Sequence, residues 1–309
     1  MFVLWTIISK SACSARCNSK ISCRLLGERR RSSRIGWEST LRSGLRLLTY
    51  LFAGAIAAMA QSNPPVIGAG GIVNTAGSPT VPAVAPGSLV SIFGTNLASS
   101  LASSGTVPLS TTVNNVSVTF NNTPAPVQFV SSGQVNVEAP WGLQTSDLQG
   151  GPAQVVVTTN GVVSAAASIQ VLASAPALFS LGGQAIAINP DGSLAAPAGS
   201  FPGIATRPAK IGDSNGLIIL ATGLGSVDAA IGDGANSADQ TRNTLVKPTV
   251  LIGGVAAQLV FSGLSPQFPG INQLNVVIPS GTPTGNAVTL QLQIDGTVSS
   301  NVATIAVSQ

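Results

Sequence analysis

The 309-residue chain contains no histidine, and after residue 60 it also lacks cysteine, tyrosine and methionine. A serine or cysteine nucleophile usually depends on a histidine base, and zinc sites are built largely from cysteine and histidine. Glycosidases need two facing carboxylates. Between residues 61 and 174 the chain offers only Glu138 and Asp147. The sequence therefore predicts a protein that is not an enzyme and binds no cofactor, with an unrecognised hydrolase as a remote alternative.

Positive charge is scarce outside the N-terminal region. Ten of the fourteen lysines and arginines lie before residue 61, and the remainder has four of them against eight aspartates and glutamates, a formal charge of −4. Proteins that bind nucleic acid carry a basic patch or stripe that contacts phosphates. The region after residue 60 has none, so no nucleic-acid partner is expected.

An apolar run occupies residues 47–60, follows Arg42 and Arg46, and ends in the small residues Ala58 and Ala60. A positive flank, a short apolar core and a small-x-small exit are typical of a secretory signal peptide. Because a helix needs about 20 apolar residues to cross a bilayer, retention of this run as a membrane anchor is the weaker alternative. We therefore expect bacterial-type export, cleavage after Ala60, and a secreted or cell-surface protein without a membrane span.

Residues 1–40 are unusual for a signal peptide because they are long, basic and contain all three cysteines, Cys13, Cys17 and Cys23. The cysteine spacing matches no zinc pattern. The arginines at 29–31 lie too far from the apolar run for a convincing twin-arginine signal. Our hypothesis is that translation starts nearer Leu41 or Leu45.

Beyond about residue 85 the sequence repeats itself at an offset of about 130–140 residues. The matching segments are 87–97 with 216–225, 116–130 with 248–261, 134–140 with 273–279, and the closing hairpins 154–171 with 289–307. This offset is far longer than the period of a solenoid. Each copy is therefore expected to be a domain with its own core.

The two copies agree in their turn residues. Asn-Gly at 160–161 matches Asp-Gly at 295–296, and Asn-Asn at 121–122 matches Gly-Gly at 253–254. These residue types tolerate the positive φ that tight hairpin turns require. Apolar residues alternate with period two on either side of the turns, which predicts short strands and no substantial helix after residue 61.

Three aspartates, Asp228, Asp233 and Asp239, lie in one long segment of the second copy with Asn236. Such a loop offers several oxygen ligands for calcium, but the spacing does not fit the twelve-residue calcium loop with its terminal glutamate. The favoured interpretation is a solvated loop whose side chains satisfy nearby backbone donors, and the three aspartates remain weak metal candidates.

Trp141 is the only tryptophan after residue 60 and follows Pro140 directly. Exposed aromatic side chains stack against sugars, so Trp141 is a weak ligand candidate. The alternative is that it caps the end of the first domain.

Residues 86–97 form a Pro-Gly pair, an apolar strand and a Gly-Thr-Asn-Leu ending, a pattern that resembles the opening strand of IPT/TIG domains. The wider set of motifs is similar to an uncharacterised family of exported proteins abundant in acidobacteria; these motifs lie at 129–136, 140–141, 175–179, 222–225 and 273–279. The resemblance covers about residues 72–309. It implies an immunoglobulin-like fold and export, and it implies no catalytic residues.

We therefore predict an all-β chain of two tandem immunoglobulin-like, IPT/TIG-like β-sandwiches. The predicted parts are an extension with signal peptide at 1–60, a Pro/Gly/Ala-rich leader at 61–84, the first sandwich at 85–174, a connector with a small hairpin at 175–208, and the second sandwich at 209–309.

The predicted function is a non-catalytic interaction or structural module that acts outside the cell through protein or glycan contacts. Few charges remain to protect the sheet edges, so self-association through them is also expected. The main alternative is an accessory carbohydrate-binding protein that uses Trp141.

Overall fold

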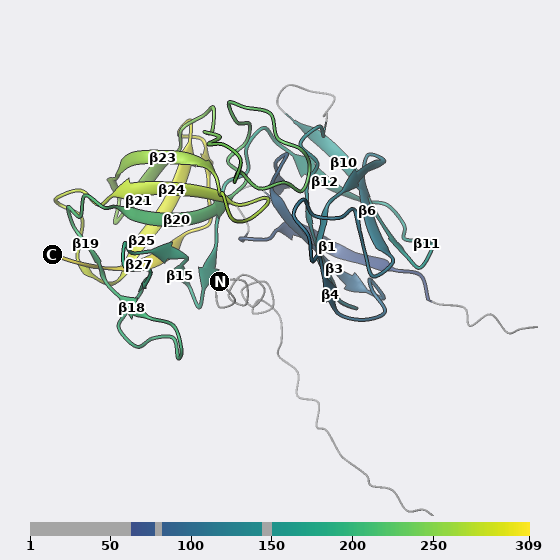
Figure 1. Ribbon diagram of the computed structural model, residues 1–309, viewed down its shortest axis with the longest axis horizontal. Helices are drawn as coiled ribbons and strands as arrows, with labels where there is room; N and C mark the ends of the chain where they lie inside the picture. The colour runs from purple at the N-terminus through teal and green to yellow at the C-terminus, as the bar shows by residue number, and fades with distance from the viewer. Residues whose placement is uncertain (1–62, 78–81, 144–149) are drawn as a thin grey trace, which may run out of the picture. The chain divides into compact units, whose positions relative to one another are not determined.

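The computed structural model describes residues 63–77, 82–143 and 150–309 (Figure 1). The predicted signal peptide, the N-terminal extension and the three cysteines lie outside the described residues. Residues 63–309 fall within one compact unit, and the regular elements described in it are all β-strands, which confirms the predicted fold class. In this part of the chain, no helix has the length and apolar character needed to cross a membrane.

The first sandwich consists of two sheets. The strands of its first sheet, in spatial order, are β1 (Val66–Asn74), β3 (Leu89–Thr95), β9 (Gln134–Glu138), β8 (Val127–Val130) and β4 (Ala102–Ser103). Those of its second sheet are β2 (Ala83–Val84), β12 (Ala167–Val171), β10 (Gly151–Thr159), β6 (Val116–Phe120) and β5 (Thr112–Val113), with β11 (Val162–Val163) on β10 and β7 (Thr123–Ala125) on β6.

The second sandwich also has two sheets. One runs β18 (Thr206–Arg207), β17 (Leu194–Ala195), β16 (Ala187–Ile188), β20 (Leu217–Thr222), β24 (Asn272–Val277) and β23 (Gln258–Leu264), with β13 (Ala177–Leu178) on β20. The other runs β14 (Ser180–Leu181), β15 (Gln184–Ala185), β27 (Ala303–Ser308), β25 (Gly285–Ile294), β21 (Thr249–Ile252) and β22 (Val255–Ala256), with β19 (Ala209–Lys210) on β27 and β26 (Val298–Ser299) on β25.

The repeated sequence gives a repeated topology. The order β3-β9-β8 in the first sandwich has its counterpart in β20-β24-β23, which Figure 1 shows side by side, and β12-β10-β6 has its counterpart in β27-β25-β21. Apolar side chains from both sheets of each sandwich face inward, so that each sandwich has its own apolar core.

The tight turns follow the predicted chemistry. Asn121 and Asn122 have φ of 46° and 66° in the turn between β6 and β7, and Gly253 and Gly254 have φ of 59° and 81° between β21 and β22. Both are two-residue turns in which each residue has the left-handed backbone conformation. Such turns match the right-handed twist of the strands that they connect.

The closing hairpins differ slightly from one another. Asn160 and Gly161 form a two-residue turn between β10 and β11, whereas the loop after β25 contains three residues because Ile294 pairs with Val298. The matched turn residues therefore lie in loops that differ in length by one residue, although Asp295 adopts the left-handed conformation as Asn160 does, with φ of 50° in both.

Residues on either side of the repeats also join the sheets. β1 pairs with β3 and β2 pairs with β12, so residues of the predicted leader contribute two strands to the first sandwich. Residues of the predicted connector contribute β13 to β18 to the sheets of the second sandwich. The physical reason is that an uncovered strand edge presents unpaired N–H and C=O groups that a neighbouring segment can satisfy.

Candidate functional site

A third apolar cluster joins the two sandwiches. Leu89 of β3 is fully buried and belongs to the same cluster as Phe179, Leu220 and Ile271 of the second sandwich. The Leu89 N–H donates to Thr222 Oγ1 at 3.0 Å, which adds a polar contact across this junction. The sandwiches therefore share buried surface in addition to a covalent link.

A polar group at the junction is formed by Glu138, Trp141, Asp233 and Gly234, which we call the junction cluster. Glu138 ends β9 and has no exposed surface. The Gly234 N–H donates to Glu138 Oε2 in a short hydrogen bond. Glu138 Oε1 and Trp141 Nε1 are both buried, and neither forms a hydrogen bond of ordinary geometry. Glu138 is therefore a buried carboxyl group with one strong donor and no cationic partner among the described residues.

The surroundings of Glu138 favour its neutral form. Burial raises the pKa of Glu138 from 4.5 to about 8, and the negative charge of Asp233 adds to the increase. The Gly234 N–H opposes this increase most, while the Trp141 indole and the Gly270 N–H oppose it to a smaller degree. The removal of the carboxylate from water outweighs these donors, so Glu138 is mainly protonated near pH 7.

Trp141 is positioned by contacts with both sandwiches. Its ring lies over Gly87, where an added Cβ would be 2.2 Å from Trp141 Cζ2. Its backbone N–H donates to Asp233 Oδ1 at 2.7 Å. This placement favours a packing role at the end of the first sandwich, as the alternative interpretation of the sequence holds. The ligand role of Trp141 stays a prediction.

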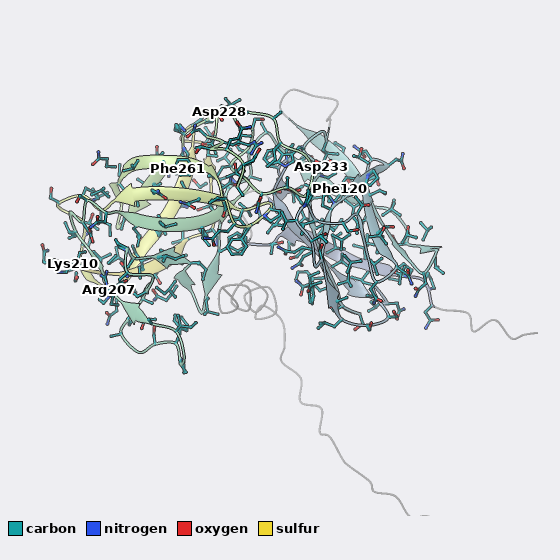
Figure 2. All side chains as sticks on the ribbon, viewed as in Figure 1. Phe120, Arg207, Lys210, Asp228, Asp233 and Phe261 are labelled. Carbon is teal, nitrogen blue, oxygen red and sulfur yellow. The ribbon has the colours of Figure 1, made fainter. Side chains whose placement is uncertain are left out.

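The three aspartates proposed as metal candidates have separate partners. Asp228 accepts two hydrogen bonds of 2.8 Å from Asn243, Asp239 pairs with Arg242, and Asp233 contacts Trp141. Figure 2 labels Asp228 and Asp233, which both lie between β20 and β21. In the ranges that the structure describes, no three His, Cys, Asp or Glu side chains form a metal-sized group. Asp228 and Asp239 therefore bond within the loop, whereas Asp233 bonds to the first sandwich.

The comparisons with known proteins concern the first sandwich most directly. Residues 75–174 match the family model of the IPT/TIG domain. The first sandwich is an IPT/TIG-like module. The match does not extend over the remainder of the predicted 72–309 resemblance, and membership of the exported acidobacterial family stays a prediction. No curated protein matches the sequence.

Three solved structures align with most of the chain at low identity. SGBP-B of the mixed-linkage glucan utilization locus of Bacteroides ovatus, in complex with a mixed-linkage heptasaccharide, is 12% identical with a TM-score of 0.30, over 73% of this chain and 42% of that one. Domains 5–6 of the S-layer protein SbsC are 12% identical with a TM-score of 0.27, over 79% and 98%. The Yersinia pseudotuberculosis adhesin InvE is 13% identical with a TM-score of 0.21, over 78% and 61%. The chain spans less than half the length of the first of these structures.

Arg242 fixes the loop that reaches the IPT/TIG-like module. It is 5% exposed, donates to the Ala230 carbonyl at 2.8 Å and binds Asp239 through two nitrogens at 2.6 and 2.9 Å. The hydrogen bonds to Arg242 lower the pKa of Asp239 to about 2. Sequence reasoning named Asp239 but missed Arg242 as its partner, although their separation of three residues was a usable signal.

Arg242→Ala is expected to increase the rate of proteolytic cleavage within residues 226–241 by roughly an order of magnitude. The reason is that the change leaves the Ala230 carbonyl and Asp239 without their donor. Limited proteolysis with mass spectrometry measures the rate. Lys210→Ala, which removes an exposed cation from β19, is the control, and equal cleavage of the two variants would contradict the structural role of Arg242.

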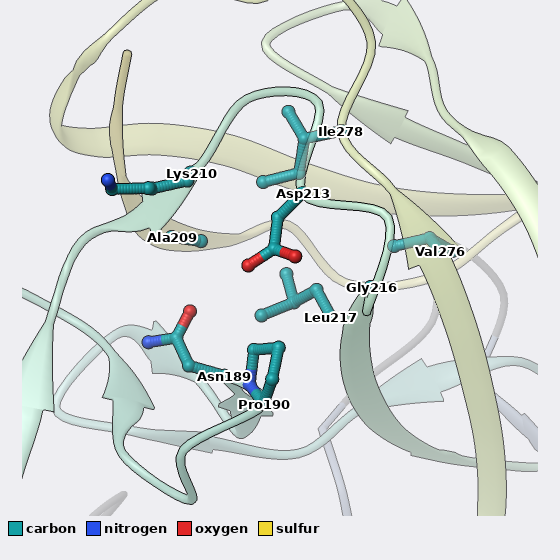
Figure 3. A pocket seen from close by; sticks show the side chains of 9 residues that line it. All are labelled: Asn189, Pro190, Ala209, Lys210, Asp213, Gly216, Leu217, Val276 and Ile278. Atoms are coloured by element: carbon teal, nitrogen blue, oxygen red, sulfur yellow. The ribbon is translucent and has the colours of Figure 1, made fainter.

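Two hollows in the second sandwich offer little for chemistry. The first is a cavity of about 10 Å³, room for one water at most, near Asn189, Asp213 and Leu217. Figure 3 shows the Asp213 carboxylate directed into this space and the Lys210 ammonium directed away from it. The second is an open hollow of about 350 Å³ beside the start of β25, and its lining has no charged side chain.

Proposed function

We propose that this chain is a non-catalytic interaction module, exported from the cell, that contacts other proteins, a second copy of itself included, through the exposed edge of β23. The supporting observation is a patch of exposed apolar side chains beside that edge. The signal-peptide pattern at residues 47–60 supports the extracellular location.

The edge of β23 is covered only in part. β23 is the last strand of its sheet, and the segment 242–244 covers its second half. The Leu264 N–H donates to the Arg242 carbonyl at 3.0 Å, and the Thr244 N–H donates to the Ser262 carbonyl at 2.9 Å. In its first half, Val260 is an extra residue in the register against β24. Val260 is 63% exposed at this bulge, on the same face of β23 as the exposed Gln258.

Leu245 and Val246 extend the apolar surface around Val260. They are 63% and 40% exposed. The residues on either side of them contact Ser262, since Thr244 Oγ1 lies 2.7 Å from Ser262 Oγ and Lys247 Nζ donates to the Ser262 carbonyl at 3.4 Å. These contacts hold the segment 244–247 beside Ser262, two residues along β23 from Val260. We call Leu245, Val246 and Val260 the β23 edge patch.

Unprotected edges and grouped apolar side chains are features of interaction surfaces. β23 contains no charged residue, whereas natural edge strands are commonly protected by lysine or other charges. A partner strand added to such an edge gains main-chain hydrogen bonds and buries the apolar side chains. The patch therefore fits an extended protein segment better than a soluble small molecule.

Val260→Lys is expected to weaken self-association of the secreted chain about tenfold or more, because an ammonium group in the centre of the patch must lose water when the edge is paired. Sedimentation velocity over a range of concentrations measures this. Val163→Lys is the matched control, since Val163 is 57% exposed on β11 of the other sandwich. A wild-type chain that stays monomeric throughout, or an equal effect of both variants, would contradict self-association through the patch.

The carbohydrate-binding alternative has a separate test. A glycan array would be probed with the wild-type chain and with Trp141→Ala. Binding that depends on Trp141 would favour a glycan partner over a protein partner, whereas binding retained in the variant would argue against stacking on Trp141. A broad hydrolase screen addresses the remote enzymatic alternative.

A further inference from the structure

We propose that the junction cluster is a pH-sensitive lock between the two sandwiches, in which protonated Glu138 keeps them docked and its ionisation in mildly alkaline solution loosens them. The proposal is independent of the β23 edge patch, because it concerns a different surface and requires no partner.

One group of the contacts between the sandwiches, apart from the apolar cluster around Leu89, converges on residues 233–234. The Gly234 N–H donates to Glu138, the Gly234 carbonyl accepts from the Leu109 N–H at 2.9 Å, and Asp233 accepts from the Trp141 N–H at 2.7 Å. A short piece of the loop between β20 and β21 thus bonds to two separate segments of the first sandwich. Release of Glu138 from Gly234 would remove the most buried of these bonds.

The groups around Glu138 offer an ionised carboxylate little stabilisation. Leu89 pairs with Glu138 across the sheet, and the segment 265–271, which contains Gly270, has no charged residue. The loop 226–243 carries Asp228, Asp233, Asp239 and Arg242, of which the structure pairs Arg242 with Asp239. In the described part of the chain, Asp233 is the charged group that acts on Glu138, and its charge has the same sign.

The direction of the pH effect follows from these surroundings. The pKa of Glu138 is about 8 in the docked structure against an ordinary value of 4.5, so the docked state binds a proton that the exposed carboxyl group has lost. The stabilisation of the docked state by the proton on Glu138 is complete below pH 4.5 and is lost as the pH rises through about 8. Separation of residues 233–234 from the first sandwich lets water reach the new carboxylate and moves it away from Asp233.

The experiment uses the full chain with Trp5→Phe and Trp37→Phe, so that Trp141 is the only tryptophan. Trp141 fluorescence and the radius of gyration from small-angle X-ray scattering would be followed from pH 5 to pH 10. The expected result is a fluorescence transition with a midpoint near pH 8 and a larger radius of gyration above it.

Three variants assign the transition. Glu138→Gln cannot ionise but still accepts from the Gly234 N–H, so the transition should disappear. Asp233→Asn keeps the acceptor for the Trp141 N–H without the negative charge, so the midpoint should fall by roughly 0.5–1 pH unit. Asp295→Asn, in the distant turn after β25, should leave the midpoint unchanged.

The proposal fails if the wild-type fluorescence is flat over this range, if Glu138→Gln retains the transition, or if Asp233→Asn leaves the midpoint in place. It also fails if Trp141 responds to pH while the radius of gyration stays constant, since the carboxyl group would then titrate without loosening the sandwiches. Should Glu138→Gln not fold, the Asp233→Asn midpoint decides the question alone.

Discussion

Phe179→Ala is expected to lower the free energy of unfolding by about 3–5 kcal/mol. Phe179 is fully buried in the apolar cluster that contains Leu89 of the first sandwich and Ile271 of the second. Removal of the ring leaves a cavity where the two sandwiches meet, and the loss of contacts should weaken their coupling in addition to the second sandwich itself. Denaturant unfolding gives the free energy, and amide hydrogen exchange locates the weakened contacts.

Phe120→Ala is the matched control for this change. Phe120, labelled in Figure 2, is equally buried but belongs to the core of the first sandwich. Both variants should lose similar stability. In Phe179→Ala, hydrogen exchange should become faster in peptides that contain the Leu89 amide than in peptides from the interior strand β10. In Phe120→Ala, this selective increase at Leu89 should be absent. Selective exchange at Leu89 in both variants would contradict a specific role of Phe179 at the junction.

Gly87→Ala is expected to destabilise the protein by about 2–4 kcal/mol, as the sum of a strained backbone and a steric clash. Gly87 has φ of 72°, which L-residues rarely adopt, and an added Cβ would lie 2.2 Å from the Trp141 ring. Because the ring must move, Trp141 fluorescence should shift together with the loss of stability. Thermal unfolding and the emission maximum measure the two effects.

Gly161→Ala separates the two contributions. Gly161 has φ of 81°, but nothing lies within 4 Å of an added Cβ. This variant should therefore show only the backbone strain, about 1–2 kcal/mol, and no change in Trp141 emission. If Gly87→Ala costs no more than Gly161→Ala, the close contact with Trp141 is not what requires glycine at this position.

The repeated strands were predictable from the sequence because their signals are local. Turn chemistry and period-two alternation act over a few residues, so Asn121-Asn122 and Gly253-Gly254 could be recognised as turns without knowledge of the remainder of the fold. The matched order of the turns then implied the matched sheets that the structure shows. The same local signals could not show that the leader and connector residues complete the sheets, since pairing at an edge depends on which segment is nearby in space.

The candidate site was predictable only in fragments. The sequence named Trp141 and Asp233 for separate roles as ligand and metal candidates, and it treated Glu138 only as one half of an incomplete carboxylate pair. Glu138 and Gly234 are separated by 96 residues, and no local pattern predicts that they meet. Polar and apolar residues alternate along β9, so Glu138 falls on the same face as Gln134 and Asn136, and this pattern carried no signal that Glu138 would be buried.

By itself, the amino-acid sequence determined that two alike β-sandwiches form, because the conformational limits of asparagine, aspartate and glycine at tight turns and the alternation of apolar residues are properties of short segments. Only the tertiary structure decided that Glu138 is buried beside Asp233, that Trp141 lies over Gly87, and that the segment 242–244 pairs with the second half of β23. These are contacts between segments far apart in the chain, and their electrostatic and packing consequences exist only once the loops of one sandwich reach the other.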